Sequence, residues 1–296
     1  MKDVQIVTEP YPPSAWTKTI VRGVDQHNIA MTGCSDYYPV GFFIKGAGGQ
    51  IVGGLLGDIW GGWLHVGSLW VEKSLRGRGY GKELMTRAER YAIGKACSDA
   101  FLQTGSFEAR PLYEKLGYHV YGELNDHPIK PHSRYFMTKR LSSDNETHQH
   151  ISELEIAMDP YASAAHVSVI REGIYLHAGA AIGLPENPGS QFGYFLRDDN
   201  GEIRGGAIGN IWGNWMFLDN LWVDLPLRGS GCATKLITAA EEHAIVQRCS
   251  DAFLDTFSFQ ARPLYEKLGY HVFAELKDHP KGHNQYWLTK RLVSKS

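Results

Sequence analysis

The sequence has little cysteine, little excess charge and no long apolar run. Its four cysteines, Cys34, Cys97, Cys232 and Cys249, form no CxxC pair and no zinc-site spacing, so we expect reduced thiols. The formal net charge of −2 gives no basic field for nucleic acid or an anionic membrane. No apolar run reaches the roughly 18 to 20 residues of a membrane span, and the first residues lack the apolar core of a signal peptide. These absences favour a cytoplasmic protein that binds a small molecule.

What the chain does contain is enough apolar material for two folded domains. It has 296 residues, of which 43% are hydrophobic and 21% are charged. These fractions are those of ordinary globular proteins. Because single domains usually run to roughly 100 to 200 residues, the length predicts two.

A long internal repeat divides the chain. "SDAFLQTGSFEARPLYEKLGYHV" (98–120) recurs as "SDAFLDTFSFQARPLYEKLGYHV" (250–272), and 51–71 recurs as 203–223, with an offset of 152 residues in both cases. Solenoid repeats are much shorter, roughly 20 to 50 residues, so this is a tandem duplication of a whole domain. The polar stretch "SSDNETHQH" (142–150) is typical of a linker. We therefore predict domains at 1–142 and 151–296.

Each half predicts a layered domain with a mixed sheet. "WGGW" (60–63) and "WGNW" (212–215) place two turn residues between strand runs, which predicts tight hairpins whose tryptophans pair across the strands. Apolar residues at helical spacing follow in 81–96, then the buried strand "AFLQT", a short helix in "EARPLYEKLG" and two closing strands. Strands precede and follow helices, so the fold class is α/β (α+β mixed).

A glycine-rich loop lies between a strand and a helix in each half. The loops are "RGRGYG" (76–81) and "RGSGCA" (228–233). The first N–H groups of a helix have no internal partner and glycine lets an anion approach the backbone, so the arrangement suits a pyrophosphate. Arg76, Arg78 and Arg228 can add charge-assisted bonds to it. Neither loop matches the P-loop or the dinucleotide fingerprint. The alternative is a glycine turn that merely joins a strand to a helix.

Two motifs in order, found twice, resemble a known family. V-x-x-x-x-R-G-x-G-x-[GA] at 71–81 and 223–233, followed in each half by "ARPLYEKLGY", is similar to the GNAT superfamily of N-acetyltransferases. The resemblance covers nearly all of each half. It implies two tandem domains, each with a central, mostly antiparallel mixed sheet flanked by helices, and acetyl coenzyme A (acetyl-CoA) in a cleft where two parallel strands splay apart.

The resemblance also implies which positions bind acetyl-CoA. The strand before the loop would offer its backbone to the pantetheine arm, and the loop amides would hold the pyrophosphate. The matching positions are Leu69, Trp70, Val71, Arg76, Gly77, Arg78, Gly79, Tyr80 and Gly81 in the first copy, and Leu221, Trp222, Val223, Arg228, Gly229, Ser230, Gly231, Cys232 and Ala233 in the second.

The same resemblance implies an acid and a base. The tyrosine of the "LYEKLG" helix often protonates the departing thiolate in the family, and the matching residues are Tyr113 and Tyr265. A phenol with a pKa near 10 is protonated at neutral pH and can donate. The alternative is a packed aromatic at a helix start. As base, the second copy offers Asp219, whereas the first has Gly67 there, with His65 nearby as a possible substitute or a structural histidine.

Two features remain open at this stage. Many family members carry an asparagine that bonds to the cofactor where this sequence has Ser106 and Ser258. The loops after the repeat contain His127, His132, His279 and His283, whose spacing matches no standard metal site, so we expect no metal and favour loop histidines beside the acceptor cleft.

Together these features predict an N-acetyltransferase. It would move an acetyl group from acetyl-CoA to a primary amine of a small-molecule acceptor by direct attack, since no Cys/His or Ser/His/Asp arrangement supports an acyl-enzyme. One domain could instead be a non-catalytic scaffold, or the whole protein could be an acyl-CoA sensor. Because two similar domains share one chain, we expect a monomer.

Overall fold

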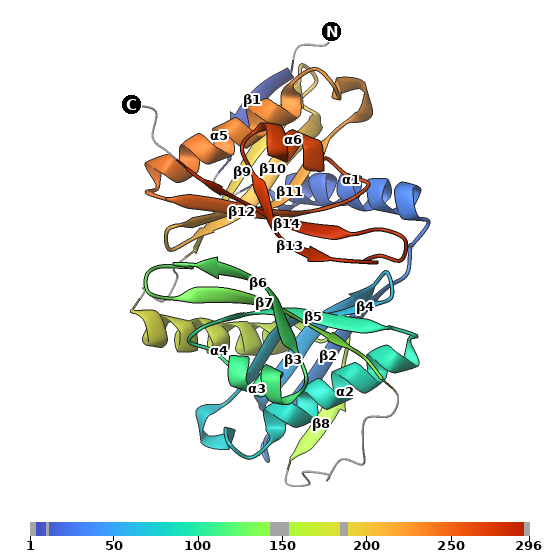
Figure 1. Ribbon diagram of the computed structural model, residues 1–296, viewed down its shortest axis with the longest axis vertical. Coiled ribbons are helices and arrows are strands. Elements are labelled where there is room, and N and C mark those ends of the chain that lie inside the picture. The colour runs from blue at the N-terminus through green and yellow to red at the C-terminus, as the bar shows by residue number, and fades with distance from the viewer. Residues whose placement is uncertain (1–3, 10–11, 143–153, 184–188, 293–296) are drawn as a thin grey trace.

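The computed structural model describes residues 4–9, 12–142, 154–183 and 189–292. Strands of these residues form two seven-stranded sheets that lie one above the other, each with helices around it (Figure 1). The N-terminal sheet has the strand order β6-β7-β5-β4-β3-β2-β8, and the C-terminal sheet has the order β1-β9-β10-β11-β12-β14-β13. The linker predicted at 142–150 lies outside the described residues from 143 on.

The two copies of the repeat contain the same elements in the same order. The first copy comprises β1 (Val4–Thr8), α1 (Ser14–Thr32), β2 (Tyr37–Lys45), β3 (Ile51–Trp60), β4 (Trp63–Val71), a 3-10 turn (Lys73–Leu75), α2 (Tyr80–Gly94), β5 (Asp99–Gly105), α3 (Arg110–Lys115), β6 (His119–Asn125) and β7 (Ser133–Arg140). The second comprises β8 (Glu155–Met158), α4 (Ala164–Ile182), β9 (Gly189–Asp198), β10 (Ile203–Trp212), β11 (Trp215–Val223), a 3-10 turn (Leu225–Leu227), α5 (Cys232–Val246), β12 (Asp251–Phe257), α6 (Arg262–Lys267), β13 (His271–Leu276) and β14 (Gln285–Arg291).

The first strand and helix of each copy belong to the other copy's sheet. β1 pairs antiparallel with β9, from Val4↔Asp198 to Thr8↔Tyr194, and β8 pairs with β2. The helices follow their strands: α1 packs on β10 and β11, while α4 packs on β3 and β4. Figure 1 shows α1 beside the C-terminal sheet and α4 beside the N-terminal one. Each folded unit is therefore built from both copies.

A close glycine–tryptophan contact seats each exchanged helix. A Cβ at Gly23 of α1 would lie 2.3 Å from Trp222 of β11, and a Cβ at Gly173 of α4 would lie 2.1 Å from Trp70 of β4. Both distances are far below van der Waals contact, so only glycine allows the indole to lie flat on the helix. The same glycine–tryptophan contact occurs in both folded units and fixes the position of the exchanged helix on its sheet.

The opposite face of each sheet carries the main core. In the N-terminal sheet, Leu84, Met85, Ala88 and Ala92 of α2 are fully buried, at the helical spacing that the sequence predicts. The hairpin prediction is also confirmed, since Trp60 faces Trp63 and Trp212 faces Trp215 across the strands.

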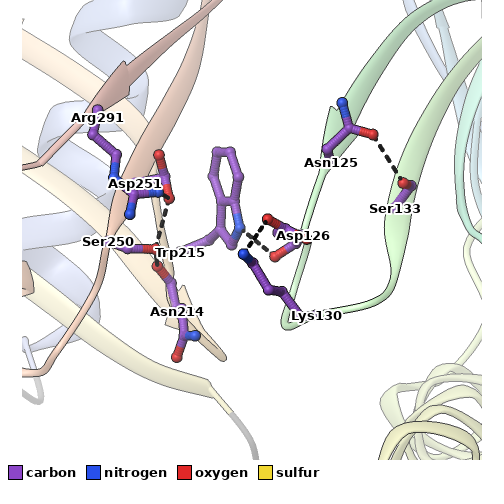
Figure 2. A network of polar contacts seen from close by, with 9 residues as sticks. All are labelled: Asn125, Asp126, Lys130, Ser133, Asn214, Trp215, Ser250, Asp251 and Arg291. Carbon is purple, nitrogen blue, oxygen red and sulfur yellow. Dashed lines mark hydrogen bonds and ion pairs between the residues drawn. The ribbon is translucent and has the colours of Figure 1, made fainter.

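The two units meet through a second, smaller core. β6 and β13 lie side by side, and Gly122 of β6 leaves room for Ala274 of β13. Each hairpin tryptophan also bonds across the interface: Trp63 Nε1 donates to the Asp278 carbonyl at 3.0 Å, and Trp215 Nε1 to the Asp126 carbonyl at 2.8 Å. Figure 2 shows the second bond, with the ring of Trp215 directed at the turn that follows β6.

The cysteines are thiols, and three of them lie in the cores. The structure gives all four cysteines as free thiols, and Cys97 and Cys249 are buried. Burial raises the pKa of both thiols to about 11, so they stay protonated. Among the helices in the described residues, none is long and apolar enough to cross a membrane.

Candidate active sites

Both glycine loops have a backbone that suits an anion. In 76–81 the φ angles of Gly77 and Gly79 are +77° and +88°, and 228–233 repeats them, with +84° at Gly231. The helices α2 and α5 begin directly after Gly79 and Gly231, and no side chain caps either one. Their first N–H groups therefore point outward. A Cβ at Gly77 or Gly231 would meet nothing within 4 Å, so the space in front of the loop is open to a ligand.

The loop side chains are partly committed to the protein itself. Arg76 Nε donates to the Val71 carbonyl at 2.9 Å, and the second copy repeats this bond at the same distance. The bond fixes the loop against the end of its strand and leaves only the outer guanidinium nitrogens for phosphate. Tyr80 is 1% exposed and Cys232 is 8% exposed. These two residues can therefore serve a ligand through their backbone alone.

The remaining loop residues surround the same opening. Arg78 is exposed at the rim of the first loop. A Cβ at Gly81 would lie 3.2 Å from Leu112, which places the first turn of α2 against α3. In the second loop, Ser230 Oγ donates to the Leu227 carbonyl and lies 3.2 Å from Cys232 Sγ. The first loop thus carries more positive charge at its rim than the second.

The two central parallel strands splay apart in both sheets, as the family resemblance implies. β4 pairs with β5 only from Trp63 to Val66, and β11 pairs with β12 only from Trp215 to Leu218. The strands also carry a bulge at this point, because Gly67 and Asp219 have no partner on the neighbouring antiparallel strand. Beyond the bulge, β4 and β11 have no ladder pairing with β5 and β12.

The strand positions expected to bind the pantetheine arm, 69–71 and 221–223, lie directly beyond the splay. Their side chains are used elsewhere. Trp70 and Trp222 contact the exchanged helices, and the valines at the strand ends are buried in the main cores. Only the backbone of this segment is available to a ligand, which is the contact that the family resemblance implies.

The tyrosines of the short helices are buried and protonated. Tyr113 and Tyr265 are each 6% exposed. Burial raises the pKa of both phenols above their usual value, and the nearby charge of Glu108 or Asp255 raises it further. A phenol that holds its proton this firmly is available only as a proton donor.

Two carboxylates meet at the splay of the C-terminal sheet. Asp219 and Asp255 are the first residues after the last paired position, Leu218↔Leu254. Asp219 is exposed as a residue, yet desolvation by the surrounding protein raises the pKa of its carboxyl. Burial, with the charge of Asp219, raises the pKa of Asp255 to about 6, although Gln285 Nε2 donates to Asp255 Oδ2 at 2.8 Å. Such a carboxylate is poised to exchange a proton near neutral pH.

A comparison with protein-family models identifies the family of the chain. The model described as the Acetyltransferase (GNAT) family matches residues 7–118 and 164–270. The chain belongs to the GNAT family of acetyltransferases. Both halves are therefore GNAT domains in sequence, although each folded GNAT unit takes its first strand and helix from the other half.

Named relatives and solved structures resemble single GNAT domains of the chain. Blasticidin-S acetyltransferase of Streptomyces morookaense is 36% identical over 95 residues, 32% of this chain and 70% of the relative. Acetyltransferase Atu2258 of Agrobacterium fabrum is 28% identical over 138 residues, 47% of this chain and 99% of the relative. A solved acetyltransferase from Bacillus cereus is 29% identical, with 49% of this chain and 98% of that chain covered and a TM-score of 0.41.

The N-terminal GNAT unit differs at the same place. Its counterparts of Asp219 and Asp255 are Gly67 and Gln103, so it has no carboxylate at either position. Arg134 instead donates to Gln103 Oε1 at 3.1 Å. Burial lowers the pKa of Arg134 to about 10, which still leaves it charged at neutral pH. The C-terminal splay thus has two carboxylates where the N-terminal splay has a guanidinium, and the charge of Glu108 reaches both Arg134 and Tyr113 there.

His65, the substitute base that the sequence suggests for the N-terminal unit, is engaged elsewhere. Its Nδ1 lies 3.1 Å from Asp58 Oδ1, and its ring stacks on Phe101 with centroids 4.7 Å apart. The charge of His65 also lowers the pKa of Asp255, which places the histidine opposite the C-terminal splay rather than only beside its own.

The exchanged helices reach both GNAT sites. Asn28 of α1 accepts a hydrogen bond from Gln260 Nε2 at 2.7 Å, at the turn before α6. His27 contacts the ring of Phe259. In the other unit, His177 of α4 lies 3.4 Å from Arg76 of the glycine loop. Each site therefore has a wall from the opposite copy.

The serines and loop histidines have a structural explanation. Ser106 Oγ lies 3.3 Å from His132 Nδ1 and accepts from Ser133 N, and Ser258 makes the same contacts with His283 and Asn284. The hydroxyls thus hold two loops together, which leaves the expected cofactor contact unsupported by geometry. Within the described ranges, no group of three or more histidines, cysteines or acids is placed to share a metal.

Sequence reasoning missed Asp255 and Gln285. Both lie in strands that read as buried, so the pattern gives no cause to single them out. The available signal is the comparison of the two copies. Asp255 replaces Gln103 within a segment that is otherwise nearly identical, and Gln285 replaces Arg134 at the equivalent position of the last strand.

Proposed function

We propose that the protein is an N-acetyltransferase that moves an acetyl group from acetyl-CoA to a primary amine, with the reaction at the C-terminal sheet. The observation that supports this most strongly is the pair Asp219 and Asp255 at the splay, together with Tyr265, whose pKa is raised by burial and further by the charge of Asp255. Base and acid thus lie within electrostatic reach of each other beside the opening that suits the thioester.

Direct attack needs two proton transfers at the C-terminal splay, one to a carboxylate and one from a tyrosine. An ammonium acceptor loses one proton to Asp255, assisted by Asp219, and the freed lone pair attacks the thioester carbonyl carbon. The C–S bond breaks, and the hydroxyl of Tyr265 donates its proton to the leaving sulfur. The second N–H proton leaves the new amide nitrogen and restores the phenol through solvent. The net change is one amide, one thiol and one released proton.

The glycine loops supply position rather than chemistry. The open backbone at Gly229 and Gly231 and the uncapped start of α5 suit the pyrophosphate of acetyl-CoA. Backbone groups of 221–223 suit the pantetheine arm. Held in this way, the thioester would lie at the splay, next to the carboxylates, and such positioning can supply a large share of the rate.

The N-terminal unit fits a different role. It retains the loop and Tyr113, but Gly67 and Gln103 offer no base at the splay. We propose that this unit binds acetyl-CoA without turnover and serves as a scaffold for the other site. The relative named Blasticidin-S acetyltransferase supports a small-molecule antibiotic amine as one class of acceptor to examine.

The test combines turnover with stoichiometry. Release of free thiol from acetyl-CoA would be measured over a panel of amines, with calorimetric titration of acetyl-CoA in parallel. We expect turnover of at least one amine, two bound acetyl-CoA per chain, and loss of turnover only when a bulky residue replaces Gly231. Replacement at Gly79 should remove one binding event and leave turnover in place. Activity that disappears with Gly79 and survives at Gly231 would reverse the assignment.

A further inference from the structure

A small cavity lies between the two sheets, beside the C-terminal splay. Its volume is about 140 Å³, several times the roughly 30 Å³ that a water molecule occupies in the liquid. The walls are largely aromatic, and both copies contribute to them. The lining residues that matter here are Asp58, Trp60 and Trp63 from the first copy and Phe257, His279 and Gln285 from the second.

Two buried polar atoms of residues that line this cavity have no partner in the described structure. His279 is 4% exposed and Gln285 is 5% exposed, and neither His279 Nδ1 nor Gln285 Oε1 makes a hydrogen bond. Burial and the charge of His65 lower the pKa of His279 to about 3, so the ring is neutral, with one nitrogen that donates and one that accepts. An unpaired buried polar atom is costly, and the Gln285 oxygen calls for a donor.

The carboxylate of Asp58 adds a negative charge to the same walls, where it pairs with His65, whose Nδ1 lies 3.1 Å from Asp58 Oδ1. Burial raises the pKa of the Tyr37 phenol, and the charge of Asp58 raises it further. Aromatic faces, a carboxylate and neutral acceptors are the groups that together recognise an organic cation with several N–H donors.

The other copy shows what such a cavity holds. Arg134 occupies the position of Gln285, since it pairs with Gly105 and Leu124 as Gln285 pairs with Phe257 and Leu276. Its guanidinium carbon lies 5.4 Å from the ring centre of Trp212 and 5.6 Å from that of Phe253.

These rings match the rings of the cavity. Trp212 is the counterpart of Trp60 and Phe253 that of Phe101, which also lines the cavity. Both aromatic sites are built from the two copies together. At one of them Arg134 of the first copy places its guanidinium beside Trp212 and Phe253 of the second. At the cavity, Gln285 stands in place of that arginine and Asp58 in place of Asn210.

We propose that this cavity binds the guanidinium group of the acceptor and so directs its amine to the carboxylates of the C-terminal splay. The substrate class is a small molecule that carries a guanidinium and a primary amine. Gln285 links the two places, because its Nε2 donates to Asp255 while its Oε1 faces no protein donor. The inference deepens the proposed function and rests on it for the acetylation step, but not for the binding step.

The binding step is tested first, without acetyl-CoA. Methylguanidinium chloride would be titrated into the full-length protein and followed by tryptophan fluorescence, with tetramethylammonium chloride at equal ionic strength as reference. We expect saturable binding to the wild type that is at least tenfold weaker in Gln285→Arg, which places an arginine where the other copy has one. Asp58→Asn, which copies Asn210, should weaken binding in the same direction.

A matched variant in the other copy separates binding from folding. Arg134→Gln removes the resident guanidinium, and we expect it to add a second methylguanidinium site. Thermal unfolding of each variant shows whether it is folded. Equal binding by folded wild type and folded Gln285→Arg, or no binding by the wild type, overturns the proposal.

The link to catalysis is tested by two acceptors. Agmatine carries an amine and a guanidinium on one short chain, and pentylamine lacks the guanidinium. We expect at least tenfold higher kcat/KM for agmatine, reduced to near equality in Gln285→Arg. If neither amine, nor any other, is acetylated while methylguanidinium still binds, the proposed function fails and the cavity assignment stands. If amines are acetylated with no preference for agmatine, the substrate class is wrong.

Discussion

Replacing Asp255 by asparagine tests the base and its electrostatic cost in one variant. The amide oxygen of the new side chain would still accept the hydrogen bond from Gln285, so the local packing is kept, but the amide cannot take a proton. If Asp255 is the general base, turnover falls by about 10²-fold to 10⁴-fold, the usual contribution of general acid–base catalysis. In the wild type, kcat/KM should fall about tenfold per pH unit below the pKa of Asp255, which is about 6.

The same substitution should stabilise the fold at neutral pH. The pKa of Asp255 is raised from 3.8 to about 6, so the native protein holds a proton that the unfolded chain has lost between these two pH values. Stability therefore falls as pH rises through this window and stays reduced above it. At about 1.36 kcal/mol per pKa unit, the whole effect is at most about 3 kcal/mol. Asparagine has no such dependence, so the variant gains up to this amount above pH 6.

The measurement is urea unfolding of both proteins from pH 4 to pH 8, alongside thiol-release kinetics. Asp251→Asn is the matched control on the same strand, because Asp251 forms an ion pair at 2.8 Å with Arg291, whose side chain is exposed. Its loss should cost less than about 1 kcal/mol and leave turnover unchanged. Parallel stability curves for wild type and Asp255→Asn, with turnover retained, would refute the electrostatic reasoning and the role of the residue together.

Three further predictions concern the acid, the exchanged helices and the assembly. Tyr265→Phe should reduce turnover at least about 10²-fold, whereas Tyr113→Phe should leave it nearly unchanged; the reverse order would move the chemistry to the N-terminal sheet. Gly23→Ala should destabilise the protein by about 1 to 3 kcal/mol in thermal or urea unfolding, because its Cβ would meet Trp222, and this outweighs the better helix propensity of alanine. The control is Gly94→Ala, whose Cβ would meet nothing within 4 Å and which should be neutral or mildly stabilising. A protease site placed within 143–150 should give two fragments that elute together at the mass of one chain, since each holds a strand and helix of the other's sheet. Fragments that separate without denaturant would contradict the exchange. An intact protein that elutes as a dimer would contradict the monomer.

Sequence reasoning recovers the features that are encoded locally. The hairpins at Trp60–Trp63 and Trp212–Trp215 and the glycine loops depend on short spacings within one stretch of chain. Periodicity and turn chemistry report such features directly. The splay is expected from the family resemblance, and the repeat from self-similarity at a long offset.

The exchange of β1 and β8 has no local signal. A strand's pattern shows that one face is buried but not which sheet it joins, and here the two candidate sheets are nearly the same in sequence. The contacts that distinguish the arrangement are long-range, such as Gly23 against Trp222 and Asn28 with Gln260. In the sequence, a glycine inside a helix pattern indicates only a lower helix propensity, because its tryptophan partner lies far away along the chain.

The exchange explains why a copy without a base would be retained. The wall beside the C-terminal splay includes α1, through Asn28, and the cavity beside it includes Trp60 and Asp58, all from the first copy. Loss of that copy would therefore remove β1 from the C-terminal sheet, together with part of the cavity wall. Under the proposed function, the first copy keeps these contributions although Gln103 stands in the place of Asp255. Selection on one active site is then enough to maintain both halves of the chain.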